Sequence, residues 1–179
     1  HKIALVTDSI ADLPKDIMDK HQIHMIPLNL IVDDSNYLDK LTISPSYLYE
    51  LMDKGENYPT SSQPTRKAAE DFLNFVSTNY DSIVVVTVSN RMSGTFETIT
   101  KAAQKLQDAG KKIAVIDSKS NSAAQGLIVL KAAESIEAGK SFEEVVYQTE
   151  KAVQNTKIFV HVKTLKYMAR SGRINKITG

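Results

Sequence analysis

Short runs of consecutive apolar residues recur along the chain and constrain its fold more than any other feature. Five such segments occur, at residues 3–6, 23–32, 83–86, 113–116 and 158–160. Runs of Val and Ile without polar alternation are typical of strands covered on both faces, as in a parallel sheet. Pro27, inside the second segment, favours a sheet edge or a bend there.

The stretches between these runs have helical periodicity. Apolar residues fall on one helical stripe at 68–76, 96–106 and 142–153. The expected start and stop signals are first-turn prolines at Pro14, Pro45 and Pro64, capping boxes at 122–125 and 141–144, and terminal glycines at Gly110 and Gly139. Strands alternating with helices predict an α/β fold with right-handed crossovers. We therefore expect a parallel-sheet, Rossmann-like three-layer domain over residues 1–156.

Composition excludes several classes of function. The 179 residues include 22 Lys and Arg against 21 Asp and Glu, so the net charge of +1 gives no footprint for nucleic acid or an anionic membrane. Cysteine is absent, which excludes disulfides and thiolate chemistry. No apolar run approaches the ~18 residues of a membrane span, and the amino-terminal run is too short for a secretory signal. We expect a cytoplasmic protein without stable membrane insertion.

Small polar residues follow three of the predicted strands. They cluster at 7–9, 89–95 and 117–120, and a fourth cluster, TSSQPT, covers 60–65. The carboxyl ends of parallel strands share one edge of a sheet, where ligands bind in open α/β folds. Helix amino termini there offer free N–H groups and a positive dipole end. These turns predict a cradle for a carboxylate or phosphate, although single Ser, Thr or Asp residues also serve as plain helix caps.

Two other chemistries have weaker support. A nucleophilic Ser93 lacks the glycine two positions earlier that the G-x-S-x-G elbow requires, and its base would be His21, His24 or His161. A serine esterase therefore remains an alternative, as does a regulatory domain that binds a small anion. His21 and His24 have the H-x-x-H spacing, but no carboxylate accompanies them at the spacing of a metal site. We therefore expect no metal, and we expect no catalytic residue.

Six motifs, in order, resemble the DegV family of bacterial fatty-acid-binding proteins. They are VTDSIADLP at 6–14, MIPLNL at 25–30, TSSQPT at 60–65, MSGTFET at 92–98, VIDSKSNSAAQG at 115–126 and TLKYMARSGRI at 164–174. In this family a long-chain fatty acid lies between two domains and is presented to a separate ATP-dependent fatty acid kinase. The acyl phosphate then enters phospholipid synthesis. The resemblance implies a lipid-binding subunit rather than an enzyme, with the fatty acid as ligand and no other cofactor.

The resemblance also implies which residues bind. The carboxylate would be held by the hydroxyls of Ser61, Ser62 and Ser93 near the Gly94 amide, with Thr60 substituting for the family's Thr at position 61. Arg170 and Arg173 would face the headgroup or the kinase. Family members are longer, so residues 157–179 are expected to begin a second α/β domain that is mostly absent from this chain. Dimerisation is one way to cover the surface it leaves.

Overall fold

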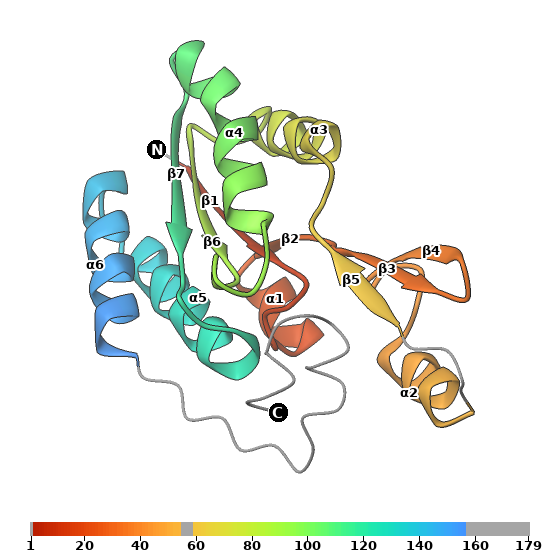
Figure 1. The fold of residues 1–179 in the computed structure, drawn as a ribbon. Coiled ribbons are helices and arrows are strands. Elements are labelled where there is room, and N and C mark those ends of the chain that lie inside the picture. The colour runs from red at the N-terminus through yellow and green to blue at the C-terminus, as the bar shows by residue number, and fades with distance from the viewer. Residues whose placement is uncertain (1, 55–58, 157–179) are drawn as a thin grey trace.

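The structure is a computed structural model that describes residues 2–54 and 59–156, and its centre is a parallel sheet (Figure 1). The sheet has the order β2-β1-β6-β7 and is formed by β1 (Ile3–Asp8), β2 (His24–Ile26), β6 (Ser82–Thr87) and β7 (Lys112–Asp117). All three pairings are parallel. β6 is buried along its whole length, as its SIVVVT sequence predicts. The expectation of a parallel-sheet α/β domain is confirmed.

Helices cover both faces of this sheet and complete three layers. They are α1 (Lys15–Lys20), α3 (Arg66–Ser77), α4 (Thr95–Asp108), α5 (Ser122–Glu137) and α6 (Phe142–Asn155). On one face, Leu73 of α3 and Ile99 of α4 pack against Val85 of β6. On the other, the side chains of α5 and α6 pack against Val84 and Val86. Successive side chains of a strand point to opposite faces, so the unbroken Val run serves both layers.

A second, antiparallel sheet projects from the main domain, on the right in Figure 1. It has the order β4-β3-β5 and consists of β3 (Asn29–Val32), β4 (Ser35–Leu38) and β5 (Thr60–Ser62), accompanied by α2 (Pro45–Asp53). Leu30, Val32 and Ile43 form its own small apolar cluster, with Tyr37, Leu48 and Leu51 packed around it. We call residues 29–53 and 60–62 the small-sheet unit.

The sequence did not predict this unit. The apolar segment 23–32 was expected to be one extended piece, and it splits at Pro27 into β2, an edge of the main sheet, and β3. The bend that Pro27 favours is thus confirmed. The stretch 54–65 looked irregular, yet residues 60–62 form β5.

Most of the helix signals hold, and three do not. Pro45 is the first residue of α2, Ser141 forms a complete capping box, and Gly110 and Gly139 end their helices at φ of 91° and 75°. Pro14 is the cap of α1, and Pro64 precedes the cap of α3. The box at 122–125 is wrong, because Asn121 caps α5 without a side-chain bond and Gln125 is buried elsewhere. The predicted strand 158–160 lies outside the described residues.

Candidate functional site

The candidate site lies at the carboxyl ends of β1 and β6. β1 pairs with β2 on one side and with β6 on the other, so the strand order reverses direction beside it. Such a switch point is where open α/β sheets bind ligands. The turn after β6 carries Ser93 and Gly94 into α4, which puts the predicted cradle at this edge.

Asp8, at the end of β1, anchors this edge. Its carboxylate is fully buried and accepts hydrogen bonds from the backbone N–H of Val88 (2.6 Å) and of Ile10 (3.1 Å). The Nε2 of Gln125, from α5, donates to the same carboxylate at 3.0 Å. Burial raises the pKa of Asp8 above its usual value, although these hydrogen bonds oppose the rise. Asp8 therefore ties β1 to the turn that follows β6.

Hydrogen bonds from backbone N–H groups connect the loops around Asp8 to one another. The Ser89 N–H donates to the Ser120 carbonyl (2.8 Å), and the Asn90 N–H donates to Asp117 Oδ1 (3.2 Å). The Asp12 N–H donates to the carbonyl of Ser122 at 3.1 Å. The predicted meeting of the three polar turns at one rim is confirmed by these bonds.

The start of α4 is organised around Ser93. The Ser93 Oγ shares a hydrogen bond of 2.8 Å with the Thr95 hydroxyl and accepts one of 3.3 Å from the Thr95 N–H. Gly94 is the cap residue and provides no side chain. Ser93 and Gly94 are half-buried, so the first turn of α4 reaches solvent at this point. A helix start of this kind can hold a carboxylate through backbone N–H groups and a hydroxyl.

The three hydroxyls of β5 do not converge. Ser61 pairs with the buried Leu30, so its side chain shares the α2-facing side of the small sheet. Thr60 and Ser62 pair with Ile31 and Asn29 and lie on the opposite side, where both are exposed. One carboxylate can therefore contact only one of these two sets.

Gln63 links β5 to the start of α4. A Cβ atom built on Gly94 would lie 3.0 Å from Gln63 Nε2, so the amide of Gln63 rests against the glycine. The Asn29 Nδ2 donates to the Gln63 carbonyl at 3.3 Å and fixes its backbone. The predicted neighbourhood of TSSQPT and the SGT turn is confirmed by this contact. The sequence analysis gave Gln63 no individual role and placed Gln125 only in a predicted capping box.

The other predicted groups lie elsewhere. His21 pairs with Glu137 at 2.5 Å and His24 with Tyr80 at 3.3 Å, so neither activates Ser93. His161, Arg170 and Arg173 lie outside the described residues. Within 2–54 and 59–156, no cluster of His, Asp and Glu could hold a metal ion. No helix in these ranges is long and apolar enough to cross a membrane.

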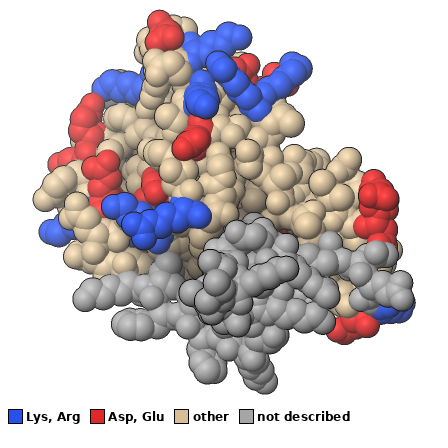
Figure 2. Space-filling view, in the orientation of Figure 1, with Lys and Arg blue, Asp and Glu red and all other residues tan. Residues whose placement is uncertain are grey.

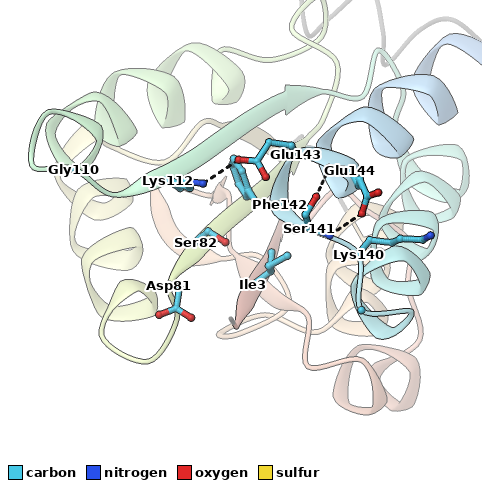
Figure 3. Close-up of a pocket in the computed structure, with 11 residues that line it drawn as sticks. Ile3, Asp81, Ser82, Gly110, Lys112, Lys140, Ser141, Phe142, Glu143 and Glu144 are labelled. Atoms are coloured by element: carbon cyan, nitrogen blue, oxygen red, sulfur yellow. Dashed lines mark hydrogen bonds and ion pairs between the residues drawn. The ribbon is translucent and has the colours of Figure 1, made fainter.

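A hollow of about 720 Å³ opens at the opposite, amino-terminal edge of the sheet (Figure 3). Two of its charged side chains pair with each other, since Lys112 bonds to Glu143 at 2.9 Å. The start of α6 beside it is closed by its own capping box of Ser141 and Glu144. Figure 2 shows acidic and basic side chains interspersed over the visible face.

Comparison with known proteins identifies relatives along the chain. The model of the DegV family, described as uncharacterised proteins, matches residues 2–179. A DegV domain-containing protein of Clostridium acetobutylicum is 33% identical over 179 residues, which are 99% of this chain and 62% of the relative. Protein DegV of Bacillus subtilis is 31% identical, over 97% of this chain and 61% of its own. The chain thus spans about 62% of the length of these curated relatives.

Solved structures agree with this assignment. A Thermus thermophilus DegV family protein, described for its fatty acid binding, aligns with a TM-score of 0.87 and 29% identity over 99% of this chain and 62% of its own. DegV of Bacillus subtilis, a fatty acid binding protein, gives 0.78 and 32% over 86% and 54%. A stearic-acid-binding protein of Eubacterium ventriosum gives 0.74 and 28% over 84% and 52%. With a family match over residues 2–179 and this shared fold, the chain belongs to the DegV family.

Proposed function

We propose that the protein binds a long-chain fatty acid, with the carboxylate at the start of α4. The observation that supports the proposal is the contact of Gln63 with Gly94, which brings the end of β5 close to the start of α4. Relatives of this fold are described as fatty acid binding. A helix start with an added hydroxyl suits a single negative charge.

Both hydrogen bonds to the carboxylate and burial of the acyl chain contribute to binding. A carboxylate that leaves water must be fully hydrogen-bonded, because an unpaired buried charge is costly. Ser93 provides a hydroxyl, and the backbone at Gly94 leads into the free N–H groups of the first turn of α4. Each methylene of the acyl chain that leaves water contributes roughly 0.8 kcal/mol. The long chain then supplies most of the affinity, and the headgroup contacts fix its orientation.

From β5 we assign the main contact to Ser61. Gln63 follows Ser61 by two positions, and side chains two apart along an extended chain point to the same side. In the proposed arrangement the chain stays extended through Gln63, whose amide rests on Gly94, so that Ser61 is the β5 hydroxyl on the side of α4. Ser61 is also less exposed than Thr60 and Ser62. The latter two contribute little to carboxylate binding.

The remaining parts of the function concern partners. The protein carries its ligand to a separate ATP-dependent kinase in the cytoplasm, which phosphorylates the carboxylate for phospholipid synthesis. Arg170 and Arg173 contact the headgroup or that kinase, because guanidinium groups suit carboxylates and phosphates. Residues 157–179 begin a second domain after the first domain of residues 1–156.

Organic extraction of the purified protein and mass spectrometry of the extract test the ligand. We expect a long-chain fatty acid in near-stoichiometric amount. An empty extract, together with no uptake of added stearic acid, contradicts the proposal.

Two further assays test the chemistry. Incubation of the loaded protein with ATP and a fatty acid kinase should yield an acyl phosphate, which hydroxylamine traps as a hydroxamate. A serine-reactive phosphonate should leave Ser93 unlabelled, because the described histidines bond to other partners. Labelling of Ser93 would favour the esterase alternative.

A further inference from the structure

The side chain of Gln63 leaves no room for a side chain at position 94. Its φ of −76° and ψ of 7° suit any residue, so conformational freedom does not explain the glycine. A Cβ atom there would lie 3.0 Å from Nε2, 3.1 Å from Cδ and 3.2 Å from Oε1 of Gln63. The three distances are nearly equal, which means that the amide group of Gln63 lies flat over Gly94.

The amide group of Gln63 is available to a ligand. The backbone of Gln63 is fixed by the hydrogen bond from the Asn29 side chain, and the next residue, Pro64, is buried. The position of Gln63 is therefore well defined. Among residues 2–54 and 59–156, no hydrogen bond involves the side-chain amide itself. Its N–H donors therefore stand free and exposed within contact distance of the α4 start.

We propose that Gln63 is a further carboxylate-binding residue and that its amide makes the site prefer an acid to a neutral headgroup. The inference rests on the proposed fatty acid binding at Ser93 and Gly94. Serine hydroxyls can donate or accept, so they bind an alcohol as well as a carboxylate. The amide adds an N–H donor at the same point, and a donor to a charged acceptor makes a stronger bond than a neutral pair.

Replacing the amide by a carboxylate tests this assignment. Gln63→Glu keeps the size of the side chain and sets a negative charge against the start of α4. Dissociation constants of octadecanoic acid and octadecanol are measured at pH 8 by displacement of a fluorescent fatty acid. We expect the acid to bind at least about tenfold more weakly, the value of one lost charged hydrogen bond or more, while octadecanol changes less than about threefold. Gln154→Glu, an equally exposed site on α6, should change neither constant.

Each outcome decides between the two claims. Equal weakening of acid and alcohol, or no change in either, overturns the role of Gln63 while the wild-type protein still binds the acid. A wild-type protein that binds neither ligand overturns the proposed function, and the inference with it.

A second variant pair makes the contact itself measurable. Gly94→Ala inserts a methyl group 3.0 Å from the amide and should displace it, weakening acid binding several-fold. In a Gln63→Ala background the amide is no longer there to be displaced, so the same change should have little further effect on the acid. Additive effects of the two substitutions would contradict a shared contact.

Discussion

Ser93 offers a ligand its own hydroxyl and lies beside the free N–H groups at the start of α4. Within the described residues its side chain bonds only to Thr95, so its removal leaves the fold nearly intact. We expect Ser93→Ala to weaken fatty acid binding by about 1–3 kcal/mol, the cost of leaving a charged acceptor short of one donor. Displacement titration measures the loss. Ser135→Ala, at the far end of α5, is the control, and an unchanged affinity in Ser93→Ala would move the carboxylate elsewhere.

The alternation of β5 gives a second prediction at the residue scale. Ser61 and Ser62 are adjacent and chemically identical, but their side chains lie on opposite sides of the small sheet. Ser61→Ala should weaken fatty acid binding by about 1–2 kcal/mol, and Ser62→Ala by less than about 0.5 kcal/mol. The same titration checks both variants. A larger loss in Ser62→Ala would put the ligand on the side of Ile31.

Single residues also show what sequence could predict about the site. Ser93 and Gly94 stood out because their turn holds more small polar residues than one helix cap needs. Gln63 gave no such signal, because its importance depends on a glycine 31 positions later that only the folded chain brings to it. Gln125 was misassigned as a helix cap for the same reason. Its partners, Thr7 and Asp8, are more than one hundred positions away.

Asp8 connects elements, since it links β1, α5 and the turn after β6. In Asp8→Asn, an amide N–H replaces an acceptor and faces the N–H of Val88, Ile10 or Gln125. We expect the free energy of unfolding to fall by about 1–3 kcal/mol at pH 5. Urea titration of the two proteins measures it. A loss below about 0.5 kcal/mol would mean that these bonds contribute little.

The raised pKa of Asp8 also predicts the pH dependence of that difference. The folded state holds the proton more tightly than the unfolded state, in which the pKa of Asp8 is near its ordinary value of 3.8. The contribution of Asp8 to stability is therefore complete below about pH 3.8 and declines as the pH rises through the higher folded pKa. Urea titrations from pH 4 to 8 should show the wild type losing part of its advantage over Asp8→Asn. A constant difference would mean that the pKa of Asp8 is not raised.

Elements differ in how well their sequence predicts them. β1 and β6 were evident because strands buried on both faces need unbroken apolar runs, and β7 contains a similar run although it is only partly buried. The strands of the small sheet are three or four residues long and partly polar, and β5 pairs with β3 across about 30 positions. Segments this short show no recognisable alternation of polar and apolar residues, so only their pairing in the folded chain identifies them as strands.

At the scale of the whole molecule, the small-sheet unit is attached rather than embedded. Its apolar cluster is separate from the two clusters of the main domain. Lys40 Nζ of the unit donates to the Ala11 carbonyl (2.8 Å). Two residues that flank the unit also contact the main domain, because the Leu28 N–H donates to Ser9 Oγ (3.0 Å) and the Gln63 amide rests on Gly94. A ligand bound between β5 and α4 would therefore bridge two parts of unequal stability.

Hydrogen exchange can detect that bridge. Regions with few buried apolar contacts open more readily, so amides of β3 and β5 should exchange faster than those of β6 without ligand. Added stearic acid should slow exchange both in β5 and in the first turn of α4, because a bound carboxylate holds the two together. Amides of β7 near Lys112, at the opposite edge of the sheet, serve as the internal control and should not change. Slowing confined to α4 would remove Ser61 from the site and leave the carboxylate to Ser93 and the helix start alone.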